Sequence, residues 1–282
     1  MKEFIIFGGD SFTWGEGLEL YINSERWISE RKIKNHWNDL QPKQTKESIL
    51  FRESNRFAGL VEEKLGYKSI VKKTNGGGFD DGALWISKHI KNKPKAVFLQ
   101  LTALQRINFH FSRLCKCEIC NHDIYGNVRP IAFYIECLSK LINKEKFTES
   151  DMYFLNYLKE IENIKLDLKH IDKVYQLFSD IIKRSIDILI NEYIKEWEKT
   201  TKVYLIDSWE FHTQELIKNN KELYKRLISL KGYDGKYYKN YSDWENTFPY
   251  KRIENEFPQT RNMHPTLLQH KYLSESIIEK LQ

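Results

Sequence analysis

The sequence lacks any long hydrophobic run. No apolar stretch in its 282 residues approaches the ~20 residues that a membrane-spanning helix requires, so we expect no transmembrane segment and no membrane partner. The apolar run near the start of the chain, at residues 4–7, is only a few residues long and acidic residues follow it at once. We therefore also expect no signal peptide and a cytoplasmic location.

Glycine, proline and excess charge are scarce as well. The 13 glycines and 6 prolines are too few for a fibrous chain, and a hydrophobic content of 41% is too high for a disordered one. The 45 basic and 39 acidic residues leave a net charge of +6, and the positive residues are spread along the chain. This pattern favours a lysine-rich solvated surface over a nucleic-acid partner.

Short apolar runs alternate with helical patterns at the start of the chain. Strands are expected at 3–7, 68–74 and 96–101, and helices at 48–65 and 83–90. This alternation predicts an α/β fold, in which a parallel sheet carries helices on both faces.

The middle of the chain is different. Helices are expected at 131–145, 150–162 and 165–198, before a strand at 203–207 and a last helix at 266–281. We therefore predict an α/β domain made of residues 1–107 and 200–282, and a helical insertion, residues 108–199, that contains all the cysteines.

The first predicted strand ends in Gly8-Gly9-Asp10-Ser11. Open α/β sheets bind their ligands at the carboxyl ends of their strands, and glycines allow a sharp turn that presents a hydroxyl group. This is not the G-x-S-x-G elbow, because Phe12 and Thr13 follow the serine, and the chain has no G-x-x-x-x-G-K-[ST] phosphate loop. Ser11 is a candidate nucleophile; the alternative is a serine in an ordinary turn.

A serine nucleophile needs a base, and His264 has the most suggestive position among the histidines. It lies in Asn262-Met263-His264-Pro265, a loop directly before the last predicted helix. A histidine held by a proline and a helix start can be aimed at a distant serine. A histidine before a proline, taken alone, is usually a surface loop residue, but together with Ser11 at the other end of the chain it predicts a nucleophile–base pair.

Three features together resemble the SGNH/GDSL hydrolases: the G-D-S-F-T-W-G block, the glycine loop at 75–78 and the H-P motif before the last helix. The resemblance covers residues 1–107 and 200–282. It implies a flavodoxin-like three-layer α/β/α sandwich and an esterase or deacetylase that needs no cofactor for catalysis. The implied substrate is a carboxylic ester, either a small molecule or an O-acetylated carbohydrate.

The resemblance also implies roles for single residues. Ser11 would be the nucleophile and His264 the general base, while the backbone amides of Ser11 and Gly78 would hold the oxyanion. Asp10 would brace the loop. The acid that this family places before the histidine is missing: Asn262 stands two residues before His264 and would orient the ring without supplying negative charge, and a backbone carbonyl or a distant acid such as Asp207 is the alternative.

A second departure follows the third strand, where the family has an asparagine. Here Gln100 and Thr102 are the candidate hydrogen-bond donors to the oxyanion, and Arg106 is a candidate for holding an anionic substrate group. Because of the two departures, an alternative function stays open: a binding or assembly protein with the hydrolase fold, which recognises a glycan or a protein partner.

Aromatic residues gather at 233–258, directly before the His264 loop. Rings beside hydrogen-bonding groups suit sugars, so Tyr241 and Trp244 are candidate substrate-binding residues. The alternative is a loop whose tyrosines pack on the core. The candidate substrate-binding set is completed by Asp10, Trp14 and Asn75.

All four cysteines lie between residues 115 and 137. Cys115, Cys117, Cys120 and either His122 or Cys137 have the spacing and residue types of a tetrahedral zinc site. We expect a structural zinc; reduced thiols and disulfides are the alternatives. A zinc-stabilised nucleic-acid-binding protein ranks last, because no segment concentrates the positive charge.

Overall fold

The structure is a computed structural model of the chain. It describes residues 3–22, 45–72, 79–102, 108–110, 128–130, 140, 144–146, 152, 180, 182–209, 211–257 and 264–282. Contacts between Cα atoms divide the chain into two units, Met1–Ala103 with Ile190–Gln282, and Leu104–Leu189. The boundaries that we predicted, after residues 107 and 199, lie four and ten residues further along the chain.

Four parallel strands form the sheet of the first unit. They are β1 (Phe4–Gly8), β2 (Lys68–Val71), β3 (Ala96–Gln100) and β6 (Lys202–Ile206). Their order is β2-β1-β3-β6, and every neighbouring pair is parallel. The predicted α/β fold with a parallel sheet is confirmed. All five residues of β3 are buried, as expected for a continuously apolar strand.

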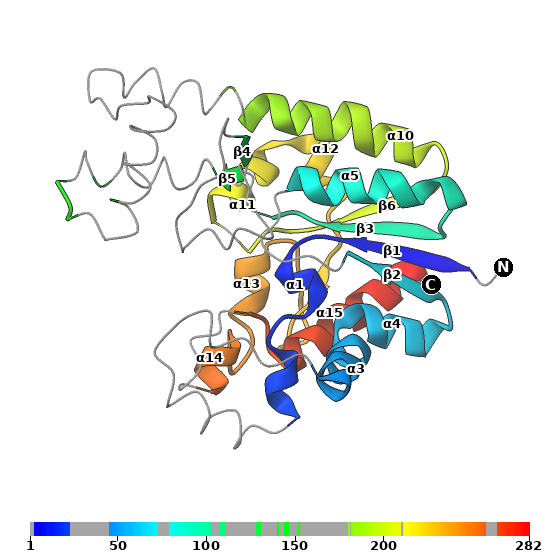
Figure 1. Ribbon diagram of the computed structural model, residues 1–282, viewed down its shortest axis with the longest axis vertical. Helices are drawn as coiled ribbons and strands as arrows, with labels where there is room; N and C mark the ends of the chain where they lie inside the picture. The colour runs from blue at the N-terminus through cyan, green and yellow to red at the C-terminus, as the bar shows by residue number, and fades with distance from the viewer. Residues whose placement is uncertain are drawn as a thin grey trace. The chain divides into compact units, whose positions relative to one another are not determined.

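Helices lie on both sides of this sheet (Figure 1). On one side are α5 (Phe79–His89) and α10 (Lys195–Glu198); on the other are α4 (Phe57–Leu65) and α15 (Leu267–Leu281). The ring of Phe7 packs edge-on against Phe57 at 5.5 Å and stacks on Phe98 at 5.4 Å, which joins β1 to α4 and β3. Each such buried phenylalanine contributes about 2–3 kcal/mol through its removal from water.

The other elements are shorter or serve as connections. In the first unit they are α1 (Ser11–Trp14), η1 (Leu18–Tyr21), α3 (Lys46–Asn55), η3 (Ile90–Asn92), α11 (Phe211–Asn219), α12 (Lys221–Tyr224), α13 (Tyr241–Glu245), α14 (Ile253–Glu256) and the antiparallel pair β7 (Leu230–Lys231) and β8 (Tyr237–Tyr238). A π-helix at Leu189–Ile194 leads into α10.

In the second unit, β4 (Asn108–His110) and β5 (Val128–Pro130) pair in antiparallel fashion. The helices predicted at 131–145 and 150–162, and most of 165–181, lie almost entirely outside the described residues; of those described, Lys140 and Met152 are helical and Lys144 and Glu145 are not. The described residues 182–198 are helical, as the last part of the 165–198 prediction required.

The helix predicted at 48–65 is in fact two helices, α3 and α4. Arg56 between them is extended, with φ −68° and ψ 154°. Gly59 permits this break, because a Cβ atom at residue 59 would lie 2.0 Å from the carbonyl oxygen of Glu53. The apolar periodicity continues across the break, which is why the pattern alone predicted one helix.

We expect Gly59→Ala to lower the free energy of unfolding by about 2 kcal/mol or more, because its methyl group would overlap a backbone carbonyl. Gly66→Ala is the matched control: Gly66 has φ 72° and open space around its Cβ position, so only backbone strain of ~1 kcal/mol applies. Urea denaturation of both variants measures the difference. Equal losses would contradict the close approach at Gly59.

Candidate active site

Two candidate residues leave the sheet side by side. Ser11 follows β1 and Thr102 follows β3, and each lies three residues beyond the paired residues Gly8 and Leu99. The chain runs from β1 to β2 on one side and returns to β3 on the other side of β1. The carboxyl ends of β1 and β3 therefore mark the switch point at which open α/β sheets bind their ligands.

Asp10 fixes the turn that carries Ser11. It is fully buried and caps α1, because its Oδ1 accepts a hydrogen bond from the backbone N–H of Phe12 at 3.0 Å. Its Oδ2 accepts another from the indole Nε1–H of Trp209 at 3.1 Å. Two donors thus compensate the burial of this carboxylate, which braces the serine turn.

A second contact ties the turn to β3. The hydroxyl of Thr13 donates to Oε1 of Gln100 at 2.7 Å. Gly9 leaves room for this contact, since a Cβ atom there would lie 2.1 Å from Thr13 Oγ1. The Gln100 side chain, one of our candidate oxyanion donors, is therefore already engaged through its oxygen.

His264 reaches the serine from the opposite end of the chain. Its Nε2 lies 2.8 Å from Ser11 Oγ. The backbone oxygen of His264 accepts from the N–H of Ile253 at 3.0 Å, and its ring packs against Phe12 with 5.2 Å between centroids. The structure thus brings the two predicted residues together within hydrogen-bond distance.

Tyr21 holds the segments on both sides of the His264 loop. Its hydroxyl donates a short hydrogen bond to the carboxylate of Glu256 in α14. The same oxygen accepts from the N–H of Leu267, the first residue of α15, at 3.3 Å. Burial, followed by the hydrogen bond to Glu256, raises the pKa of Tyr21 far above its ordinary value, so the phenol stays protonated and keeps this role.

Glu16 is a site residue that the sequence reasoning missed. Its Oε2 lies 3.5 Å from His264 Nε2, and its side chain is only 13% exposed. Its flanking residues Gly15 and Gly17 have left-handed backbone, with φ 81° and 90°, and its N–H donates to the backbone oxygen of Ser11 at 3.0 Å. An acid between two glycines directly after the serine block was the signal available in the sequence.

Thr102 is completely buried, and among the described residues its Oγ1 has no hydrogen-bond partner. Leaving a buried hydroxyl without a partner costs about 1–3 kcal/mol, and Thr102 follows the strand that pairs with the strand before Ser11. Gly78, Asn75, Arg106 and Asn262 lie outside the described residues, and their predicted roles stay predictions.

Asp207, the alternative acid, serves a different element. It follows β6, and its Oδ2 accepts from the backbone N–H of Tyr241 at 2.8 Å, at the start of α13. Burial raises the pKa of Asp207 to about 7. Near neutral pH such a carboxyl is only partly ionised, and it is already bound to the first N–H of α13. It is therefore a poor substitute for a charged triad acid.

The structure corrects the proposed aromatic substrate wall. Tyr241 and Trp244 are 1% and 0% exposed and belong to the hydrophobic core. The Trp244 indole donates to the backbone oxygen of Lys231 at 2.8 Å, and Tyr241 packs edge-on against Phe12 at 6.3 Å. These residues support the site from within, because α13 turns them inward. Tyr233, Tyr237 and Tyr250 of the same stretch are exposed.

Trp14 ends α1 and is half-buried. The guanidinium of Arg52 lies 3.9 Å from its ring centroid, and Arg52 also pairs with the buried carboxylate of Glu19 at 3.2 Å. The Trp14 ring therefore packs against the guanidinium of a buried ion pair, and this contact holds the ring beside the serine turn.

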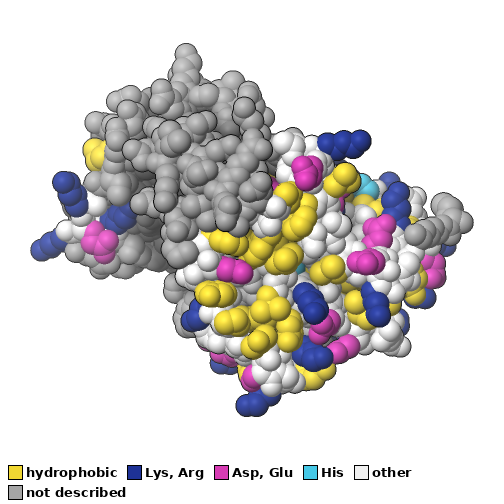
Figure 2. Space-filling view, turned by 90° about the horizontal axis from the view of Figure 1, so that it is seen from below, with side chains coloured by type: hydrophobic (Ala, Val, Ile, Leu, Met, Phe, Trp, Pro, Cys, Tyr) yellow, Lys and Arg dark blue, Asp and Glu magenta, His cyan; other side chains and the backbone are white. Residues whose placement is uncertain are grey.

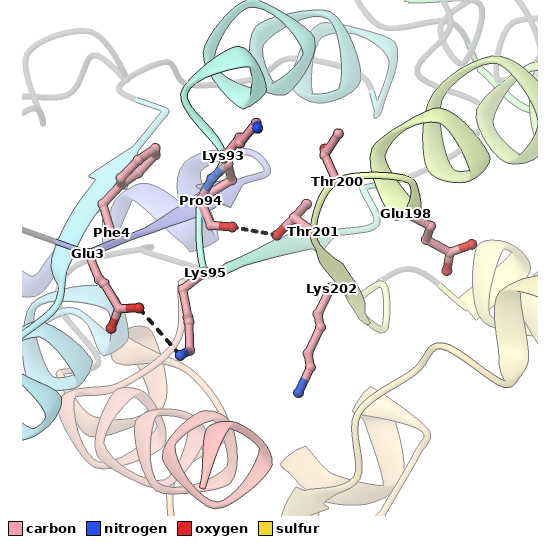
Figure 3. A pocket seen from close by; sticks show the side chains of 9 residues that line it. All are labelled: Glu3, Phe4, Lys93, Pro94, Lys95, Glu198, Thr200, Thr201 and Lys202. Atoms are coloured by element: carbon pink, nitrogen blue, oxygen red, sulfur yellow. Dashed lines mark hydrogen bonds and ion pairs between the residues drawn. The ribbon is translucent and has the colours of Figure 1, made fainter. Parts of the chain in front are cut away.

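A pocket at the other edge of the sheet is no rival site. Its lining comes from the starts of β1, β3 and β6 (Figure 3). Lys95 pairs with Glu3 at 3.4 Å, and the Thr201 hydroxyl donates to Pro94 at 2.7 Å. Figure 3 shows Lys93 pointing away from Lys95 and Lys202, so the charged groups of the pocket do not converge on one ligand.

The described surface carries charges of both signs. On the face shown in Figure 2, lysines and arginines alternate with acidic residues, and the described part of this face has no continuous basic patch. Among the described residues, no helix is long and apolar enough to cross a membrane.

The predicted zinc ligands, Cys115, Cys117, Cys120, His122 and Cys137, lie outside the described residues. Within the described ranges, no group of three or more histidines, cysteines and acids is placed to hold a metal ion. The zinc site therefore stays a prediction.

Comparisons with family models, curated proteins and solved structures find no match.

The raised pKa of Asp207 predicts a pH dependence of stability. A carboxyl with a pKa of about 7 in the folded chain and ~4 in the unfolded chain keeps its proton only when folded, so its contribution to stability falls as pH rises from about 4 to 7. Asp207→Asn removes this titration and keeps an acceptor for Tyr241. We expect the stability of the wild type to fall by ~3 kcal/mol more than that of the variant across this window.

Urea denaturation at a series of pH values measures this difference. Glu245, whose pKa burial also raises to about 7, is present in both proteins and cancels in the comparison. Parallel stability curves for the two proteins would contradict the buried state of Asp207.

Proposed function

We propose that the chain is a serine hydrolase of the SGNH/GDSL type that cleaves carboxylic esters. The observation that carries the proposal is the 2.8 Å distance between Ser11 Oγ and His264 Nε2. It lies within the range required of a nucleophile and its base, and the pair stands at the switch point of a parallel α/β sheet.

In the proposed acylation step, Ser11 Oγ attacks the ester carbonyl carbon as its proton passes to His264 Nε2. The tetrahedral intermediate then expels the alcohol, which takes that proton from Nε2. In deacylation, His264 accepts a proton from water, the resulting hydroxide attacks the acyl group on Ser11, and the carboxylic acid leaves as the proton returns to Ser11.

The negative charge that develops on the carbonyl oxygen needs donors. Ser11 is the first residue of α1, and no carbonyl within the helix accepts its backbone N–H. The second proposed donor is the hydroxyl of Thr102, which follows the neighbouring strand β3 and has no hydrogen-bond partner in the described part of the chain. The third proposed donor is the backbone amide of Gly78, which the resemblance of the chain to the SGNH/GDSL hydrolases implies. One such donor is typically worth about 3 kcal/mol in the transition state.

The finer fold and the substrate class belong to the same proposal. A parallel sheet with helices on both sides supports a flavodoxin-like three-layer sandwich. With Tyr241 and Trp244 in the core, an O-acetylated carbohydrate as substrate rests on the family resemblance.

The proposal predicts that Ser11→Ala and His264→Ala each lower the turnover of p-nitrophenyl acetate by ~10³-fold or more, because each removes one member of the reacting pair. Ser54→Ala is the control: its hydroxyl is exposed on α3 and donates to Leu50, so the rate should not change. A fluorophosphonate probe should label the wild type and not Ser11→Ala.

Equal rates in wild type and Ser11→Ala would overturn the assignment of Ser11. A wild type that neither turns over the ester nor takes the label would favour the alternative, a binding protein with a hydrolase fold.

A further inference from the structure

We propose that Glu16 supplies the negative charge that the triad lacks at the position before the histidine. In this arrangement Glu16 is a positioning residue, which acts on the ester only through His264, and the inference rests on the proposed hydrolase function. The acid comes from the segment of the nucleophile rather than from the segment of the base.

The first support is distance and burial. Oε2 of Glu16 lies 3.5 Å from His264 Nε2, with side chains only 13% and 18% exposed. A carboxylate removed this far from water requires a compensating positive charge or donor. When the imidazole takes the serine proton, it becomes the cation that such a carboxylate stabilises.

The second support is how the backbone aims this side chain. Gly15 and Gly17 adopt left-handed backbone, which a residue with a side chain rarely tolerates. The N–H groups of Gly15 and Glu16 both donate to the backbone oxygen of Ser11, at 2.9 and 3.0 Å. The chain therefore folds back over α1, and the turn that presents Ser11 also presents Glu16.

Three other charged or titratable groups that the structure describes near His264 have partners of their own or stay neutral. Asp10 is fixed by Phe12 and Trp209, and Arg252 pairs with Glu245 at 2.9 Å while its guanidinium lies over the Phe12 ring. On α15, burial first and the charge of His264 next lower the pKa of His270 to about 3, so His270 stays neutral near neutral pH. Among the described side chains, Glu16 is the carboxylate whose oxygen lies 3.5 Å from His264 Nε2, and it forms an ion pair with the ring once the ring is protonated.

The inference predicts a shift in the pH–rate profile. The base works only when it is neutral, and a nearby carboxylate favours its charged form. Glu16→Gln should therefore move the acidic limb of the kcat/KM profile to lower pH by about one unit and lower the plateau by roughly tenfold. Glu16→Asp, which keeps the charge, should retain most of the wild-type limb position.

Glu62→Gln is the matched control. Glu62 is also half-buried, but on α4, where its carboxylate accepts the N–H of Ser69 at 2.8 Å. A general loss of packing would lower the rate in either variant without moving the limb. The limb should therefore move in Glu16→Gln and stay in place in Glu62→Gln.

A second measurement does not need activity. In the Ser11→Ala background, the NMR titration midpoint of His264 should fall by about one pH unit when Glu16→Gln is added. An unchanged midpoint and limb would overturn the role of Glu16 while leaving Ser11 as the nucleophile. An ester activity that survives Ser11→Ala, by contrast, would overturn the proposed function, and the NMR titration would still report the Glu16–His264 pair.

Discussion

The hydrogen bond between Ser11 and His264 joins two segments that are 253 residues apart, so it exists only if both are held rigidly. The serine side is held by the buried carboxylate of Asp10, whose two oxygens take the N–H groups of Phe12 and Trp209. Trp209 follows β6, the far strand of the sheet. A buried carboxylate without its donors would cost several kcal/mol of stability. The loop after β6, which supplies the Trp209 donor, therefore helps to hold the turn that carries Ser11.

The carboxyl groups near this edge of the sheet are in different electrostatic states. Asp10 accepts hydrogen bonds from two donors, and burial raises the pKa of Asp207 to about 7. Glu245 pairs with Arg252. Glu16 differs from these three because its ion-pair partner is a histidine, which changes its own charge. Among these four carboxyl groups, Glu16 is therefore the one whose partner would gain a charge in the proposed proton transfer.

Much of this arrangement was predictable from local patterns. Apolar runs predicted the four strands of the parallel sheet, although not the short strands β4, β5, β7 and β8, and Ser11 and His264 stood out because glycine and proline lie near them. Three features required tertiary information. The break at Arg56 depends on a clash that Gly59 avoids, the burial of Tyr241 and Trp244 depends on which face α13 presents to the core, and Glu16 reaches His264 only through two left-handed glycines. Aromatic composition alone cannot distinguish a core face from a sugar-binding face, because tyrosine suits both.

Two distances from His264 Nε2, to Ser11 Oγ and to Glu16 Oε2, determine how an acid on this side of the ring can support the proposed catalysis. Ser11 Oγ at 2.8 Å is within hydrogen-bond range, whereas Glu16 Oε2 at 3.5 Å is beyond the usual 2.7–3.2 Å. A carboxylate at hydrogen-bond distance would hold the transferred proton and compete with the leaving alcohol. At 3.5 Å its Coulomb attraction still stabilises the imidazolium, since that attraction falls only with the inverse of distance. In the proposed mechanism, Nε2–H would therefore stay available to the leaving alcohol, as a base that must also act as an acid requires.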